Sequence, residues 1–156
     1  MKTQNKNVFT ETQRFHPIIA ILILGMNIGV VFYYNQRLLE MDMGVLITFI
    51  SSLLLPLILI VIANLRTQIS NNSITFKFFP FFISKEVKLS DISILEVKKN
   101  RMVLGWGIRL TDDGWLYNTR GRDYLEIRLK NGKTIKLGTQ KAEELEKVID
   151  NLTLDK

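Results

Sequence analysis

The chain has 156 residues, of which 47% are hydrophobic and 23% are charged, and its formal net charge is +6 at pH 7. It contains no cysteine, which excludes disulfide bonds, thiolate metal sites and thiol nucleophiles. His16 is the single histidine, and this argues against histidine-based metal centres and acid–base catalysis, because such sites need partner groups.

Two long apolar runs dominate the N-terminal part of the chain. Residues 17–34 and 44–63 contain no charged residue and no histidine, and helices of this length cross the roughly 30 Å hydrocarbon core of a bilayer. A cleaved signal peptide fits the first run poorly, because the run ends in bulky residues and a second run follows closely. We therefore predict a two-helix transmembrane hairpin over residues 17–63, preceded by a separate N-terminal segment, residues 1–16.

The charges beside these runs predict the orientation of the hairpin. Residues 1–16 carry three basic residues and one acidic residue, whereas the link 35–43 carries one basic and two acidic residues. Segments rich in Lys and Arg stay on the cytoplasmic side of the membrane. We therefore expect both chain termini in the cytoplasm and the link on the outside.

Small and polar residues in the first run suggest helix packing. Gly25 and Gly29 lie four positions apart on one predicted helix face, where another backbone can approach closely. Asn27 needs a hydrogen-bonding partner in lipid. We interpret these residues as a candidate packing face for the hairpin or for a homo-oligomer, with a chance occurrence of glycines as the alternative. Pro56 in the second run predicts a kink, and the lack of ionisable groups argues against a transporter or intramembrane hydrolase.

After the second run, the pattern changes to the alternation that is typical of short strands. A turn at Asn71-Asn72 would pair Ile69 with Ile74 in a hairpin with a two-residue link. A second turn is expected at Ser90 and Asp91. Further short strands are predicted at PFFI (80–83), VKLSDI (87–92) and ISILEVKK (92–99).

A second hairpin is predicted between residues 123 and 138. A three-residue loop, Lys130 to Gly132 with Gly132 in the left-handed conformation, would oppose Ile127 to Ile135 and keep apolar side chains on one face. A two-residue Asn-Gly turn would mix the two faces. The outer face of the bulged hairpin is expected to be solvated, and it carries Glu126, Arg128, Thr134 and Lys136.

An amphipathic helix is predicted after this hairpin, with Thr139 as a candidate N-terminal cap. Its apolar stripe must pack on the preceding sheet, and the stripe comprises Ala142, Leu145, Val148, Ile149 and Leu152. About seven strands followed by one helix is the order of a pleckstrin-homology-like antiparallel barrel that a C-terminal helix closes. We predict this fold for residues 64–156, as a small, mainly-β domain behind a membrane α-helical hairpin.

The stretch 105–121 contains two tryptophans, a tyrosine and two adjacent aspartates. Asp112 and Asp113 suit a turn, and they cannot form a shared carboxylate dyad because adjacent residues of a strand face opposite ways. The chain also lacks a serine–histidine motif and a glycine-rich phosphate loop. We therefore predict a noncatalytic protein without a cofactor or metal, in which this stretch has a structural role in strand crossing and turns.

A second interpretation makes the same region a contact surface. Trp and Tyr favour the membrane interface, and no acidic residue occurs from residue 98 to residue 111. An ordinary solvated surface is the alternative. Anionic lipid head groups or an acidic protein partner would suit the basic charge, which does not require nucleic acid. The candidate contact residues are Lys98, Lys99, Arg101, Trp106, Arg109, Trp115, Arg120 and Arg122.

Several motifs resemble those of a family of uncharacterised bacterial membrane proteins. The motifs are FTETQRF at 9–15, GWGIR at 105–109, YN with a following glycine at 117–121, and LKNGK followed by KLGTQKAEEL between 129 and 145. Members of that family consist of an N-terminal segment, a two-helix membrane hairpin and a pleckstrin-homology-like domain. The resemblance therefore implies a multi-pass protein of the bacterial cytoplasmic (inner) membrane.

Together, these features predict an integral membrane protein that presents its domain at the cytoplasmic face. Its expected partners are the lipid bilayer, anionic lipid head groups and a membrane protein. In the alternative hypothesis, the chain is an accessory or regulatory subunit of a membrane transporter or enzyme, and contributes packing rather than a surface site.

Overall fold

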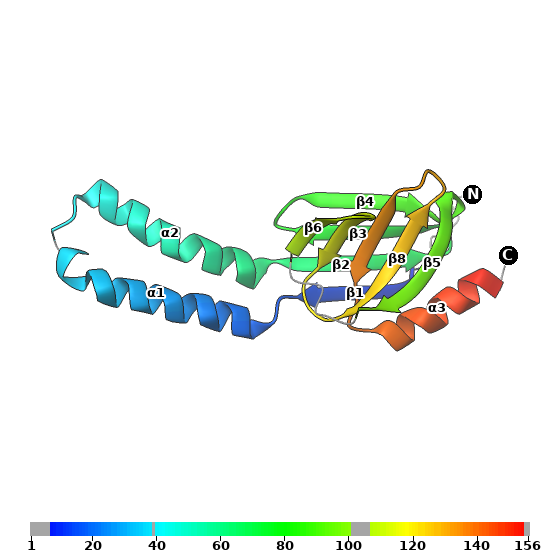
Figure 1. Ribbon diagram of the computed structural model, residues 1–156, viewed down its shortest axis with the longest axis horizontal. Helices are drawn as coiled ribbons and strands as arrows, with labels where there is room; N and C mark the ends of the chain where they lie inside the picture. The colour runs from blue at the N-terminus through cyan, green and yellow to red at the C-terminus, as the bar shows by residue number, and fades with distance from the viewer. Residues whose placement is uncertain (1–6, 39, 101–106, 155–156) are drawn as a thin grey trace. The chain divides into compact units, whose positions relative to one another are not determined.

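The computed structural model describes residues 7–38, 40–100 and 107–154, and the chain divides into two compact units. The helical unit is Phe15–Ala63, and the β unit combines Met1–Arg14 with Asn64–Lys156. The chain thus leaves the β unit, forms the helical unit and returns to the β unit (Figure 1).

The helical unit consists of α1 (Pro17–Leu38) and α2 (Met43–Ile62), which confirms the two predicted helices. Both are long and apolar enough to cross a membrane. Asp42 caps α2, because its Oδ1 accepts a hydrogen bond of 2.8 Å from the Gly44 backbone N–H. Hardly any side chain of these helices is buried within the unit, as expected of helices that lipid surrounds.

The first sheet of the β unit has the strand order β1-β2-β3-β4, and all of its neighbours are antiparallel. The register pairs Ile69 with Ile74, which confirms the predicted hairpin with its two-residue link. Residues 80–82 form the turn that joins β3 to β4, so the prediction of a strand at PFFI is wrong. The strands are β1 (Asn7–Arg14), β2 (Asn64–Ser70), β3 (Ser73–Phe79) and β4 (Ile83–Lys88).

Strand β1 comes from the segment that the sequence analysis kept apart from the domain. It pairs with β2 along its length, ending with Arg14 opposite Asn64. Its inward residues Phe9, Glu11 and Gln13 are 2%, 5% and 1% exposed. Only one of these three is apolar, so the alternation that identifies a half-buried strand from sequence is missing here.

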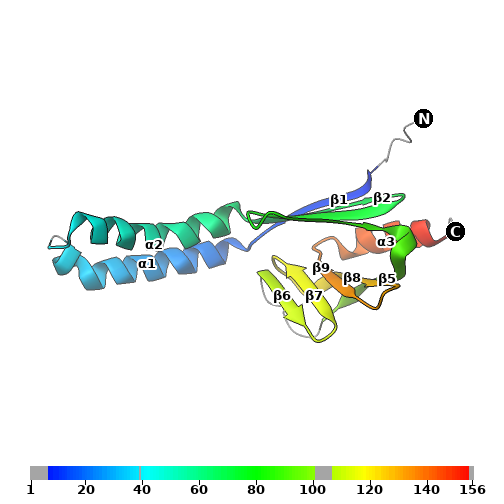
Figure 2. The ribbon, with the colours of Figure 1, turned by 90° about the horizontal axis from the view of Figure 1, so that it is seen from above.

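The second sheet has the order β5-β8-β9-β7-β6, and β7 pairs with β9 in parallel. The described strands therefore number nine in two sheets, which lie as separate layers (Figure 2), and the expected closed barrel of seven antiparallel strands is not confirmed. The short 3₁₀ turn Leu89–Asp91 passes the chain from one sheet to the other, at the predicted turn. The strands are β5 (Ile92–Lys99), β6 (Gly107–Thr111), β7 (Gly114–Asn118), β8 (Asp123–Leu129) and β9 (Thr134–Gly138).

The β8–β9 hairpin has the predicted bulged form. Ile127 lies opposite Ile135, and Gly132 has a φ of 82° and donates its N–H to the Leu129 carbonyl at 2.9 Å. However, the prediction of a solvated outer face is wrong, because Glu126 is 3% and Thr134 is 5% exposed. Charged neighbours on the same face cover Glu126, as described below.

The core of the β unit lies between the facing surfaces of the two sheets. The rings of Phe76 and Tyr117 have centroids 4.9 Å apart and join the sheets directly. Helix α3 (Ala142–Leu154) packs against β5 and β1, and Leu145 and Ile149 of its predicted stripe are buried. The largest fully buried apolar side chains are those of Leu65, Ile69, Ile74, Phe76, Phe78, Leu116, Leu125, Ile127, Leu137 and Leu145.

Candidate functional site

A buried polar junction joins β1 to the second sheet. The Glu11 carboxylate accepts hydrogen bonds of 2.7 Å from the Thr139 hydroxyl and the Gln140 backbone N–H. The Gln13 side chain donates to the Gly138 carbonyl and accepts from the Thr119 hydroxyl at 3.2 Å. Thr119 lies in the 117–121 motif, and the other residues belong to the FTETQRF and KLGTQ motifs, so the motifs have a structural role in holding the N-terminal segment in the β unit.

Asn118 of the 117–121 motif packs against Gly138 at the end of β9, in the same junction. Asn118 is fully buried, and a Cβ atom added to Gly138 would lie 2.1 Å from its Oδ1. Any larger residue at 138 would displace the amide. Thr139 accepts a 3.1 Å hydrogen bond from the Lys141 N–H, so it supports the turn before α3. The first hydrogen bond of the helix runs from the Leu145 N–H to the Lys141 carbonyl.

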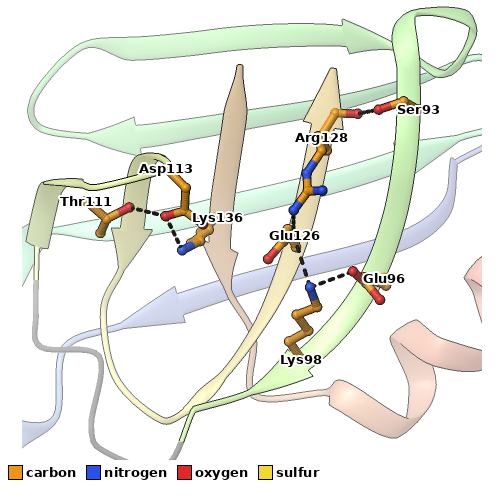
Figure 3. Close-up of polar contacts among 8 residues, drawn as sticks. All are labelled: Ser93, Glu96, Lys98, Thr111, Asp113, Glu126, Arg128 and Lys136. Carbon is orange, nitrogen blue, oxygen red and sulfur yellow. Dashed lines mark hydrogen bonds and ion pairs between the residues drawn. The ribbon is translucent and has the colours of Figure 1, made fainter. Parts of the chain in front are cut away.

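A charged cluster covers the outer face of the second sheet (Figure 3). The Glu126 carboxylate lies 3.1 Å from Lys98 Nζ and 3.0 Å from an Arg128 guanidinium nitrogen, and Lys98 Nζ also lies 2.6 Å from Glu96. Hydrogen bonds from Lys98 to Glu96 and to Glu126 raise the pKa of Lys98 above its ordinary value. The charge of Lys98 is therefore balanced by two glutamates of its own sheet. This makes Lys98 a poor candidate for binding an anion from outside.

The two adjacent aspartates lie in the turn between β6 and β7, as predicted. Asp113 lies 2.6 Å from Lys136 Nζ and accepts a 3.0 Å hydrogen bond from the Thr111 hydroxyl (Figure 3). The hydrogen bond from Lys136 holds the pKa of Asp113 below its ordinary value. Asp113 thus joins the turn to β9, and Asp112 is exposed beside it.

The fold separates the predicted contact residues into two groups. Lys98 and Lys99 lie on β5, whereas Arg109 lies on β6, at the opposite edge of the five-stranded sheet. Three strands lie between them, which is a separation of about 19 Å at about 4.8 Å per strand. Arg101 and Trp106 lie outside the described residues. The described candidates therefore do not form one continuous patch.

Part of the basic group does come together. Asp123 lies opposite Lys99, and the Asn100 N–H donates to the Arg122 carbonyl at 3.0 Å, so Lys99 and Arg122 are close neighbours. The Lys99 side chain is 74% exposed, and its Nζ lies 3.9 Å from Asp123. Arg120 belongs to the same loop between β7 and β8. Lys99 and Arg122 are exposed, whereas Lys98 and Arg120 are only partly exposed.

Trp115 lies beside a cleft that the sequence did not predict. Its ring is partly exposed and stacks on Tyr117 with centroids 6.5 Å apart. The cleft, of about 610 Å³, opens between β4 and the second sheet. Its lining includes Lys85, Val87, Leu110, Trp115, Lys133 and Ile135. No local signal could identify it, because residues from β4 and from the second sheet meet there only in the folded chain.

The candidate packing residues of α1 have different roles. Asn27 is buried, and its side-chain amide donates a 2.8 Å hydrogen bond to the Leu53 carbonyl of α2. Gly25 and Gly29 are exposed, and Cβ atoms added to them would meet no atom within 4 Å. Asn27 thus joins the two helices, whereas the glycines do not pack against α2. Their use as a face for another helix stays a prediction.

No protein-family model matches the chain, and no curated protein matches it. Among residues 7–38, 40–100 and 107–154, no three His, Asp or Glu side chains are grouped so that they could hold a metal ion.

Proposed function

We propose that the chain is a noncatalytic integral membrane protein that presents its β unit at the cytoplasmic face of a bacterial inner membrane, for interaction with a protein or with anionic lipid. The pairing of Arg14 with Asn64 carries this proposal. Strand β1 precedes α1 and β2 follows α2, yet the two strands are hydrogen-bonded neighbours. Both strands must lie on one side of any membrane, so the helices between them cross it together as a hairpin.

The charge distribution supports the cytoplasm as that side, because residues 1–16 are more basic than the link 35–43. We also propose that the β unit is pleckstrin-homology-like. A four-stranded antiparallel sheet, a second sheet packed on it and a C-terminal helix support this assignment. The parallel pairing of β7 with β9 and the open sheets differ from a closed antiparallel barrel.

Cysteine labelling tests the topology directly, since the chain has no cysteine of its own. Asn72 lies in the exposed β2–β3 turn, and Glu40 lies in the link between the helices. In membrane vesicles, we expect a membrane-impermeant maleimide to label Asn72→Cys only when the cytoplasmic face is outward. It should label Glu40→Cys only in vesicles of the opposite orientation. Labelling of both thiols from the same face would contradict the hairpin.

The nature of the partner is tested on the full chain extracted in mild detergent. Basic residues near an anionic leaflet contribute about 1 kcal/mol each, so Lys99→Glu with Arg122→Glu should reduce the retained anionic lipid about tenfold or more. Lys130→Glu with Lys133→Glu is the matched control, because both residues are exposed in the β8–β9 loop. Unchanged lipid retention would exclude this lipid site. One protein that co-purifies in stoichiometric amount would instead favour the accessory subunit.

A further inference from the structure

The turn between β3 and β4 is unusually apolar for an exposed turn. Residues 78–83 have the sequence FFPFFI, and Phe79, Phe81 and Phe82 are 45%, 50% and 90% exposed. Turns of water-soluble domains are normally built from polar residues, glycine and proline, because they face the solvent. Three exposed phenylalanine rings at one turn therefore suggest that the turn faces something other than water.

The geometry of this turn presents the rings outward. Phe82 has a φ of 53°, a left-handed conformation that bulky residues rarely adopt. Its ring lies 6.2 Å from that of Phe79, and Phe81 lies 5.3 Å from the fully buried ring of Phe78. The contact between Phe78 and Phe81 joins the turn to the core, and Phe82 is the most exposed of the rings. Backbone strain of this kind is typical of a functional turn.

The sheet register places this turn beside the entry and exit of the helical unit. Phe79 lies opposite Asn64, and Asn64 lies opposite Arg14 on its other side. Figure 1 shows the end of β1, the start of β2 and the β3–β4 turn at the same end of the sheet. Adjacent strands are about 4.8 Å apart, so Phe79 at the start of the turn is about 5 Å from Asn64 and about 10 Å from Arg14.

Covalent geometry then limits how far this sheet end can be from a membrane. Two residues separate Arg14 from Pro17, where α1 begins, and Ala63 alone separates Ile62 of α2 from Asn64. An extended residue spans at most about 3.6 Å, so these connections are no longer than about 10 Å. Where α1 and α2 cross a bilayer, these lengths keep the start of the aromatic turn within about 20 Å of the same bilayer surface.

We infer that the β3–β4 turn is a third membrane-contacting element, in which Phe79, Phe81 and Phe82 insert into the interfacial region of the cytoplasmic leaflet. The partner is the boundary between lipid head groups and acyl chains, where apolar side chains are buried about 5 to 10 Å deep. Exposed Lys77, on the strand that leads into the turn, can extend to the head groups. Together with the two chain connections, this contact would restrict the tilt of the β unit on the membrane.

This inference rests on the membrane hairpin of the proposed function, and one experiment separates the two. Single cysteines are placed at Ser84 beside the turn, at Asn72 at the other end of the sheet and at Leu54 in α2, and each carries a bimane label. The full chain is reconstituted in nanodiscs of neutral phosphatidylcholine. Quenching is then measured with nitroxide-labelled lipid and with aqueous iodide.

We expect the lipid nitroxide to quench the labels at residues 84 and 54 several-fold more than the label at residue 72, and iodide to show the reverse order. The variant Phe81→Ser with Phe82→Ser should lower the lipid quenching of the Ser84→Cys label to the level of the Asn72→Cys label. Circular dichroism should show an intact fold, because Phe82 is 90% exposed and Phe81 is half exposed at the end of the sheet, while Phe78 of the core is retained.

Three different results would overturn the inference. If the label at residue 54 is quenched by lipid but the label at residue 84 behaves like that at residue 72, the hairpin stands and the aromatic contact is wrong. If the label at residue 54 is also not quenched by lipid, the hairpin does not span the bilayer, and both proposals fail. Lipid quenching at residue 84 that is unchanged by the serine substitutions would also contradict a role for the rings.

Discussion

A chain in which residues 15–63 are replaced by the dipeptide Asn-Gly is expected to fold as a water-soluble β unit. Arg14 and Asn64 are the last paired residues of two adjacent antiparallel strands, which is where a short hairpin turn can connect them. Asn-Gly is the favoured sequence for a two-residue hairpin turn. The core of the β unit lies between its own two sheets, so removal of the helices should leave it intact.

The matched control is the fragment 65–156, which lacks β1 and is expected not to fold. Loss of Glu11 and Gln13 would remove the partners of several buried polar groups, at about 1 to 3 kcal/mol for each unsatisfied group. Loss of buried Phe9 adds about 1.5 to 3 kcal/mol. These losses are comparable with the whole stability of a small domain, about 5 to 15 kcal/mol.

The two chains are compared by amide chemical-shift dispersion and by cooperativity of thermal unfolding. We expect dispersed signals and a single transition for the Asn-Gly chain, and neither for the fragment. A fragment that folds as well as the longer chain would show that β1 is only an attachment and that the polar junction contributes little.

The second large effect is expected from Gly114→Ala, which should destabilise the β unit by about 2 to 5 kcal/mol, because steric overlap and an unfavourable backbone conformation both contribute. A Cβ atom at Gly114 would lie 1.9 Å from the backbone oxygen of Thr134, its partner in the parallel β7–β9 pair. The obstacle is a backbone atom, so a change of side-chain rotamer cannot relieve the overlap. Gly114 also has a φ of 148°, which disfavours any residue with a side chain.

Gly132→Ala is the control for the effect of backbone conformation alone. Gly132 has a φ of 82°, but no atom lies within 4 Å of an added Cβ. We expect a loss of about 1 to 2 kcal/mol from the left-handed conformation. Urea unfolding of the Asn-Gly chain measures both variants. Equal losses of stability in the two variants would mean that β7 and β9 move apart easily. The close approach of the Thr134 backbone to Gly114 would then not be needed for the stability of the sheet.

Features that depend on a few neighbouring residues were predicted correctly from the sequence, whereas features that depend on distant residues were not. The Ile69–Ile74 and Ile127–Ile135 pairs were correct, because a hairpin register depends on a few consecutive residues and on turn residues such as Gly132. The prediction of a strand at PFFI was wrong. Aromatic residues favour strands, and the sequence pattern alone could not indicate a turn with exposed rings.

The charged residues show the limit of reasoning from alternation. Glu126 occupies a polar position of an alternating strand, so a solvated face was predicted, yet Lys98 of another strand covers it. Lys98 and Arg109 are close in sequence, and the strand order places them on opposite edges of one sheet. The hydrogen bonds of Glu11 reach residues 128 and 129 positions away, so no local pattern could predict that β1 belongs to the domain.

Local composition alone was therefore enough to predict two apolar helices, two hairpins and an amphipathic C-terminal helix, because hydrophobic periodicity and turn chemistry act over a few residues. Folding decided which strands became neighbours, because the pairing of distant segments depends on the packing of the whole core. That pairing added β1 to the domain, separated the predicted basic and aromatic residues, and placed Phe79 of the β3–β4 turn opposite Asn64, where β2 begins.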